Sequence, residues 1–240
     1  MSVSGPGRVI DNGLVLYLDA SNNKSFVSGS TTWFDVSRNG NNGTLTNGPA
    51  FNSANGGSIV FDGSNDYFVG SGLPSGTNNF TYSVWIYFNG NITGNFGGGI
   101  FAAVLMSGNT NGSFEFIVRT SGSTAGGEPP ADISFGRYGQ ASTGVCLASV
   151  NMPVGRYHNI VLVRDGSASQ KMYQNGIFIG SGNLSSSGTA ASLYIGGAPA
   201  QSLYSAYHKG NIASVLIYNR ALSADEILQN YNLEKKRFGL

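Results

Sequence analysis

The acidic residues are the groups in this chain that could carry glycoside hydrolysis. Retaining hydrolysis needs two carboxyl groups about 5 Å apart, and two positions apart on a strand would place them on one face. Glu115 stands alone in FEFIVR, and Glu128 lies in a proline-containing segment. Glu226 and Glu234 belong to the C-terminal region. The sequence also lacks a Walker loop and the Gly-x-Ser-x-Gly and His-Glu-x-x-His motifs. It therefore predicts a protein that is not an enzyme.

Two aspartates could bind a cation. Asp62 and Asp66 flank the turn DGSND, and hard cations such as calcium take carboxylate oxygens. Aspartates at a turn also accept hydrogen bonds from their own backbone N–H groups. Because no third acidic residue stands nearby, we expect both aspartates to cap the turn. Calcium is the alternative, and no cofactor is required.

Aromatic residues in three predicted loops could bind a sugar. The loop GAPAQSLYSAYHKG supplies Tyr204, Tyr207 and His208, while Phe96 and Tyr138 lie in two other loops. Sugar binding needs aromatic faces together with amide or hydroxyl partners, and loops on a rigid scaffold are where such sites form. Packing is the alternative for each residue alone. As a group they are the predicted ligand-binding residues.

Charge and cysteine content exclude several classes of protein. The net charge is +1 and 10% of the residues are charged, so no basic stripe predicts nucleic-acid binding. The LVLYL run is too short to span a membrane, and the N-terminus does not have a signal-peptide pattern. Cys146 is the single cysteine. It cannot form a disulfide within the chain, and we expect it to be buried.

The segment Arg156–Gly182 is the strongest structural signal and predicts a three-stranded meander. Tyr157–Val163 is rich in β-branched and aromatic residues. Lys171–Gln174 and Ile177–Ile179 follow, joined by Asn175-Gly176, which suits a type I′ turn with two positive φ angles. The first of these strands is apolar on both alternating faces. It should therefore lie between two layers, which favours two stacked sheets.

Further segments have the short apolar or alternating pattern of strands. They are Leu14–Leu18, Phe80–Phe88, Ile100–Met106, Ser113–Thr120, Ile133–Phe135, Val145–Val150, Leu193–Ile195 and Ile212–Tyr218. Ser58–Val69 predicts a tight hairpin. Trp33 is expected to anchor the core, with a sugar-stacking platform as the alternative.

One helix is predicted, at about 223–232. Ser223 and Glu226 have the spacing of a capping box, and Leu222 and Ile227 that of a hydrophobic staple. Residues 1–12 predict an extended arm and 234–240 a solvated tail, with a docking peptide as the alternative for the tail. Chain ends stay disordered unless something holds them, so both could reach a neighbouring subunit.

The meander RYHNIVLVRDGSASQKMYQNGIFIGSG resembles the "RWHHVALVRDG…LYVDGV" meander of laminin-G-like, concanavalin A-type jelly rolls, with Asn175 where that pattern usually has Asp. GLVLYLDA, SIVFDGSNDYF and GNIASVLIYNRALSADEI fit the same family in the expected order. TTWFDVSRNGNNGTLTNGP, which begins at Thr31, resembles a run found in phage and environmental members. The resemblance covers nearly the whole chain.

This resemblance implies an all-β fold, a two-sheet antiparallel jelly-roll sandwich with one short C-terminal helix. It implies one domain over residues 13–233, in which Leu14–Leu18 pairs with the last strand. Glucanases of the superfamily carry their carboxylates in a Glu-x-Asp-x-(x)-Glu pattern, which this chain lacks.

The resemblance to phage members implies a non-catalytic virion protein, exposed on the particle as a capsid decoration or tail-associated protein. The expected partners are other virion proteins in an oligomeric assembly and glycans of a host surface, without nucleic acid or membrane. A lectin-like, carbohydrate-binding module of a cellular protein is the alternative.

Overall fold

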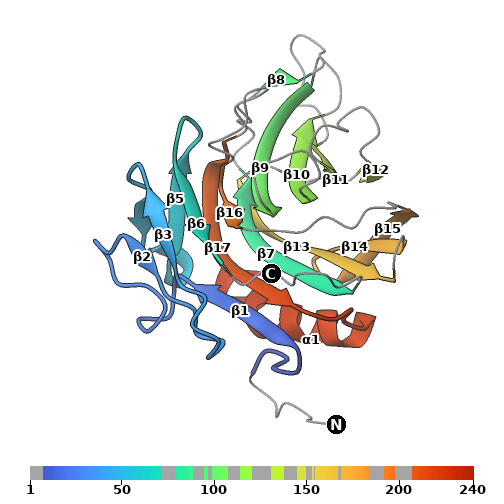
Figure 1. Cartoon of the computed structure of the whole chain (residues 1–240), viewed down its shortest axis with the longest axis horizontal. Helices are drawn as coiled ribbons and strands as arrows, with labels where there is room; N and C mark the ends of the chain where they lie inside the picture. The colour runs from blue at the N-terminus through green and yellow to red at the C-terminus, as the bar shows by residue number, and fades with distance from the viewer. Residues whose placement is uncertain are drawn as a thin grey trace.

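The computed structural model describes residues 8–71, 79–88, 95–96, 99–107, 114–120, 131–137, 145–149, 153, 155–166, 169–183, 192–197 and 207–240. Within these residues the chain forms two antiparallel sheets stacked on each other and one α-helix (Figure 1). The predicted jelly-roll sandwich is therefore confirmed.

The first sheet, which we call the helix-covered sheet, contains the first and the last strand of the described chain. Its strands are β1 (Leu14–Asp19), β4 (Ala50–Asn52), β5 (Ser58–Asp62), β7 (Phe80–Phe88), β13 (Arg156–Asp165), β14 (Ser169–Gln174), β15 (Ile177–Asn183) and β17 (Lys209–Tyr218). They are ordered β15-β14-β13-β7-β17-β5-β4, and β1 also pairs with β17. The predicted pairing of the first long strand with the last is confirmed.

The second sheet lies against the first. Its strands are β2 (Thr32–Trp33), β3 (Gly43–Thr46), β6 (Tyr67–Gly70), β8 (Asn95–Phe96), β9 (Gly99–Ser107), β10 (Phe114–Thr120), β11 (Ala131–Arg137), β12 (Val145–Ser149) and β16 (Leu193–Ile195). They are ordered β12-β11-β10-β9-β16-β6-β3-β2, and β8 pairs with β9.

The main core fills the space between the sheets. The helix-covered sheet contributes Leu16, Val84 and Ile160, and the second sheet contributes Phe68 and Ile195. All five are almost completely buried. Alternate residues of each strand therefore face one continuous apolar layer.

Trp33 is fully buried in this core and meets the Phe68 ring edge-on, with ring centroids 6.1 Å apart. The prediction of a core anchor is confirmed. A side chain with no exposed surface cannot serve as a sugar-stacking platform.

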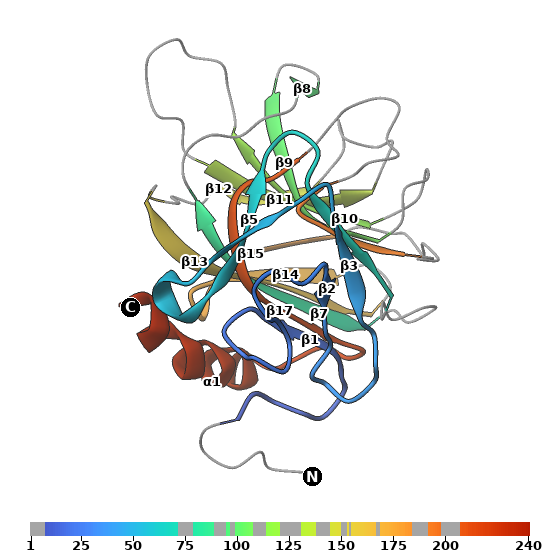
Figure 2. The ribbon, with the colours of Figure 1, turned by 90° about the vertical axis from the view of Figure 1, so that its left-hand side faces the viewer.

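The outer face of the helix-covered sheet packs against α1 (Ala224–Glu234), which runs alongside that sheet (Figures 1 and 2). Val161 and Val163, on the outer face of β13, share a second core with Leu222 and Ile227. The predicted burial of both faces of this strand is confirmed. Among the described residues, no helix has the length and apolarity needed to cross a membrane.

The predicted local signals at the helix and the meander are also confirmed. Ser223 and Glu226 form the capping box with each other's backbone N–H groups. Asn175 and Gly176 have φ angles of 52° and 78°, as a type I′ turn between β14 and β15 requires.

The prediction of a hairpin over Ser58–Val69 is wrong. β5 belongs to the helix-covered sheet and β6 to the second sheet, so the turn between them is a corner that joins the two sheets. Phe61 and Phe68 face the same core from opposite sides. Two apolar strands joined by a short turn can fill one core in this way without pairing.

The C-terminal tail does not remain solvated. Residues Lys235–Phe238 form the 3₁₀ helix η2, and the Phe238 ring stacks on Trp85 and contacts Tyr157, each at 4.3 Å between centroids. Arg237 forms an ion pair with Asp19 at 2.9 Å. The expectation of a solvated tail is therefore wrong, because burial of one aromatic ring and pairing of one cation hold it on the sheet.

The described part of the N-terminal arm is held in the same way. Ile10 is buried in the second core, and its backbone N–H donates to Asn230 Oδ1 at 2.9 Å. Val9 packs beside it. From Arg8 onward the chain is therefore tied to its own domain, and this part is not available to reach a neighbouring subunit.

Candidate functional site

The corner between β5 and β6 and the start of β17 form one rim of the sandwich. Lys209, the first residue of β17, pairs with Asp62 at the end of β5. The two predicted site regions, the aspartate turn and the loop that ends at His208, are thus brought together. We call Tyr67, Tyr194, Tyr207, Asp62 and Asp66 the rim site.

Strand alternation turns two of the tyrosines outward. Phe68 of β6 and Leu193 and Ile195 of β16 are buried in the core, so their neighbours Tyr67 and Tyr194 face away from it. Both are partly exposed, and their ring centroids are 6.1 Å apart with the planes inclined by 55°. They form an aromatic surface on the outer face of the second sheet.

Tyr207 joins this surface through close contact with a glycine. It forms an isolated β-bridge with Gly197. A Cβ atom added to Gly197 would lie 2.4 Å from Tyr207 Cδ1 and 2.9 Å from the Asp66 carbonyl oxygen, so only glycine fits there. Partial burial, followed by the nearby Tyr67 hydroxyl, raises the pKa of Tyr207. The three tyrosines and the aspartate turn are therefore neighbours.

The two aspartates bind the turn itself. Asp62 Oδ1 accepts hydrogen bonds from the backbone N–H groups of Ser64 at 2.7 Å and Asn65 at 3.2 Å. Asp66 Oδ2 accepts from the Asp62 N–H at 3.0 Å. The Ser64 bond in particular lowers the pKa of Asp62, whereas burial raises the pKa of Asp66. The described residues contain no group of three or more acidic, His or Cys side chains placed to hold a metal ion. The predicted capping of the turn is confirmed, and calcium stays the alternative.

His208 lies behind the rim. It is 2% exposed, its ring is 6.3 Å from that of Phe61, and its Nε2 has no hydrogen-bond partner among the described residues. Burial lowers its pKa to about 4, so the imidazole is neutral near pH 7. In this position His208 supports the rim from within and does not present a surface to a ligand.

The other predicted ligand residues are not placed by the structure. Tyr138 and Tyr204 lie outside the described residues, and Phe96 lies on β8, whose side chains are not described. The prediction missed Tyr67 and Tyr194. Their signal was present in the runs DYFV and LYI, where each tyrosine alternates with apolar core residues.

The rim site combines aromatic faces with polar atoms. Three tyrosine rings and hydroxyls lie beside the exposed Asp62 and the Asn47 amide, which donates to the Asn65 carbonyl oxygen at 2.7 Å. Aromatic faces with hydroxyl and amide partners suit a carbohydrate. The two carboxylates are engaged by backbone N–H groups.

Residues 61–228 match a laminin-G-type family model described as the concanavalin A-like lectin/glucanases superfamily. This segment contains every residue of the rim site. A search of curated proteins finds no match.

Similar solved structures cover most of this chain. Domain 4 of an extracellular arabinanase from Geobacillus stearothermophilus, in complex with arabinotriose, has a TM-score of 0.62 and 17% identity, covering 91% of this chain and 98% of that chain. The binding domain of botulinum neurotoxin DC in complex with SialylT has a TM-score of 0.58 and 13% identity, covering 93% of this chain and 52% of that chain. Trypanosoma rangeli sialidase in complex with sialic acid has a TM-score of 0.60 and 17% identity, covering 93% of this chain and 33% of that chain. The chain thus spans about half of the toxin domain and a third of the sialidase, and these likenesses concern the fold.

Proposed function

This chain belongs to the concanavalin A-like lectin/glucanases superfamily, and we propose that it is a non-catalytic glycan-binding module that contacts sugar through the rim site. The observation that carries the proposal is the partly exposed tyrosine surface beside the aspartate turn. Sugar rings stack on such faces while hydroxyls bond to neighbouring polar atoms.

Two further observations support a binding role. Similar folds occur in an arabinanase domain in complex with arabinotriose and a toxin binding domain in complex with SialylT. At the rim, Asp62 and Asp66 each accept hydrogen bonds from backbone N–H groups of the turn, which is the role of residues that shape a binding loop.

We test the rim site with Tyr194→Ala, measured by glycan array and then calorimetry on the best neutral oligosaccharide. Loss of a stacking ring should weaken binding roughly tenfold, which corresponds to about 1.4 kcal/mol. Phe178→Ala is the matched control, because Phe178 is an exposed aromatic residue on β15 that lies away from the rim. If both variants bind equally well, or the wild type binds no glycan, the proposed function is wrong.

We also propose that the module is carried on the surface of a virus particle, as a decoration or tail-associated protein that assembles with other virion proteins. The support is the resemblance of the run beginning at Thr31 to phage and environmental members, together with the low surface charge. A carbohydrate-binding protein of a cell is the alternative. Mass spectrometry of what co-purifies with the native protein separates the two, since structural virion proteins are expected only in the first case.

A further inference from the structure

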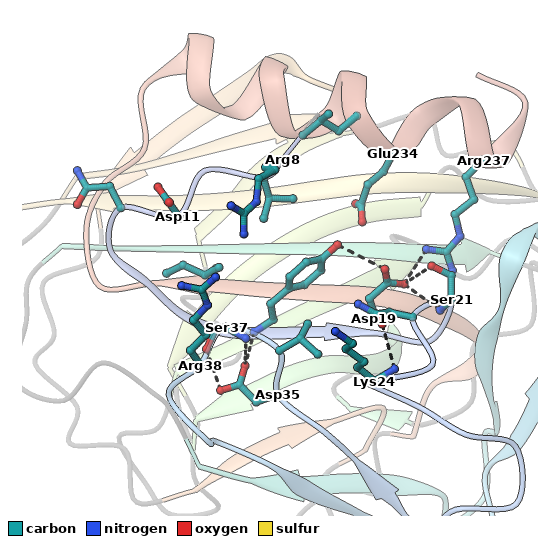
Figure 3. A pocket seen from close by; sticks show the side chains of 17 residues that line it. Arg8, Asp11, Asp19, Ser21, Lys24, Asp35, Ser37, Arg38, Glu234 and Arg237 are labelled. Atoms are coloured by element: carbon teal, nitrogen blue, oxygen red, sulfur yellow. Dashed lines mark hydrogen bonds and ion pairs between the residues drawn. The ribbon is translucent and has the colours of Figure 1, made fainter. Parts of the chain in front are cut away.

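A second candidate site lies on the outer face of the helix-covered sheet. A pocket of about 1310 Å³ opens between β1, the segments 8–12 and 35–38, and the junction of α1 with η2. Tyr17 lies in it because its neighbours Leu16 and Leu18 face the core. We call it the arginine pocket, and Figure 3 shows the side chains that line it. Every lining residue lies outside the segment 61–228 that matches the family.

Two carboxylates of the pocket are already satisfied from within the protein. Asp19 Oδ1 accepts from Arg237 at 2.9 Å and from the Ser21 hydroxyl at 2.8 Å. Asp35 accepts from the backbone N–H groups of Tyr17 at 2.9 Å and Ser37 at 2.8 Å. The charge of Asp19 is balanced by Arg237. Asp35 keeps its charge, but its oxygens are occupied by groups of the protein, so neither carboxylate is free to accept a hydrogen bond from a ligand.

Glu234 contributes a third carboxyl group at the far wall. Its oxygens accept from Ser214 Oγ at 3.1 and 3.2 Å. Burial, and then the charge of Asp19, raise its pKa to about 7. Near neutral pH this group is therefore only partly ionised.

The cations at the pocket mouth have no such partners. Arg8, Lys24 and Arg38 are exposed, and none forms a side-chain hydrogen bond or ion pair with another described residue. Among the described residues, Asp11 is the carboxylate of the pocket whose side chain has no partner. The lining carries equal numbers of cationic and acidic side chains, but the side chains with free hydrogen-bonding groups are mainly cationic donors, which suit an anion.

Two of these cations reach the pocket from different parts of the chain. Arg8 comes from the N-terminal segment and Arg38 from the loop after β2, and both line the pocket together with Tyr17 (Figure 3 labels the two arginines). Arg38 has a φ of 80°, a left-handed backbone conformation that is uncommon for a residue with a long side chain. Guanidinium groups bind planar oxyanions through paired N–H donors. The partly exposed Tyr17 ring offers a stacking face in the same pocket.

We propose that the arginine pocket binds a carboxylate-bearing oligosaccharide, with Arg8 and Arg38 holding the carboxylate and Tyr17 contacting the sugar ring. The pocket volume exceeds the roughly 300–1,000 Å³ of ordinary small-molecule pockets, so more than one sugar unit fits. The sugar class rests on the proposed function. The preference for an anion rests on the free guanidinium donors of Arg8 and Arg38.

The test uses the full chain in calorimetry at low ionic strength, with two acidic probes and their neutral counterparts. The probes are trigalacturonate with its methyl ester, and 3′-sialyllactose with lactose. We expect at least one acidic probe to bind about tenfold more tightly than its counterpart. The double variant Arg8→Gln, Arg38→Gln should lose this preference. Arg156→Gln is the matched control, since it removes one exposed arginine of β13.

Three outcomes overturn the inference: neither acidic probe is preferred, the double variant keeps the preference, or inorganic sulfate binds as tightly as the trisaccharide and marks a general anion site. Tyr194→Ala separates this test from that of the rim site. If neutral glycans fail to bind while arginine-dependent binding of an acidic probe persists, the rim proposal fails and the arginine pocket stands.

Discussion

The rim site and the arginine pocket lie along the same strand but are built in different ways. β17 begins with Lys209 opposite Asp62 at the rim, and further along it Ser214 lies opposite Asp19 at the pocket. The rim presents uncharged rings turned outward by strand alternation, inside the family segment. The pocket is a charged site assembled from both ends of the chain, outside that segment. Strand pattern alone can create the first site, whereas the second exists only if the termini dock.

A buried titratable group lies at each site, and burial disfavours its charged form. At the rim this group is His208, with a pKa of about 4. At the pocket it is Glu234, with a pKa of about 7. His208 is a base and Glu234 is an acid. Their contributions to the free energy of unfolding should therefore change with pH in opposite directions.

The largest expected effect follows from removing the tail. Deletion of residues 235–240 removes Phe238 from Trp85 and leaves Asp19, largely shielded from solvent, without Arg237. We expect the free energy of unfolding to fall by roughly 3–5 kcal/mol, measured by urea denaturation. Deletion of residues 239–240 alone is the control and should change it by less than about 1 kcal/mol. Equal stability of both truncated proteins would show that the docked tail contributes nothing.

The pocket end should lose stability as pH rises. Glu234 faces Asp19, Arg237 and Ser214, and its pKa is raised from 4.5 to about 7. Its contribution is therefore complete below pH 4.5 and is lost as pH rises toward 7, by up to about 3 kcal/mol. Glu234→Gln should remove this loss. The measurement is the difference in unfolding free energy between variant and wild type from pH 4 to 8, and a difference that does not change with pH contradicts the prediction.

The rim end should lose stability as pH falls. The pKa of His208 is lowered from 6.5 to about 4 by burial, so protonation favours the unfolded chain between these values. The loss should reach up to about 3 kcal/mol at pH 4. Relative to the wild type, His208→Asn should become more stable as pH falls, whereas Glu234→Gln should become more stable than the wild type as pH rises. The comparison between the two ends fails if both variants shift the profile in the same direction.

The sequence predicted the parts of the fold that depend on local pattern. Alternation on β13, the Asn175-Gly176 turn and the Ser223 capping box each follow from residues a few positions apart. The pairing of β1 with β17 followed from the family resemblance. The corner after β5 was missed because a short turn between apolar strands is equally compatible with pairing and with crossing between sheets.

The candidate sites were harder to predict, for two reasons. Tyr67 and Tyr194 follow from alternation once their strands are assigned, so the rim could have been predicted more fully. In the tail, charged neighbours concealed the spacing of Ile227, Tyr231, Glu234 and Phe238, which fall on one helical face. Arg8 and Arg38 line one pocket because distant parts of the chain pack together, which no local pattern records.

The smallest effect on stability gives the sharpest contrast between the two sites. Arg38 has a φ of 80° at the pocket, and Asn47 a φ of 69° at the rim. The left-handed backbone conformation is sterically unfavourable for a residue with a long side chain, whereas asparagine adopts it readily. Arg38→Gly should therefore raise the free energy of unfolding by about 0.5–1 kcal/mol while removing the preference for acidic glycans. Asn47→Gly should give no gain, because it relieves little strain and loses the bond to the Asn65 carbonyl. Thermal unfolding and calorimetry measure both quantities.

Stability gained together with lost binding would mean that the strained arginine is kept for its ligand, whereas lost stability in Arg38→Gly would mean that the side chain serves the fold.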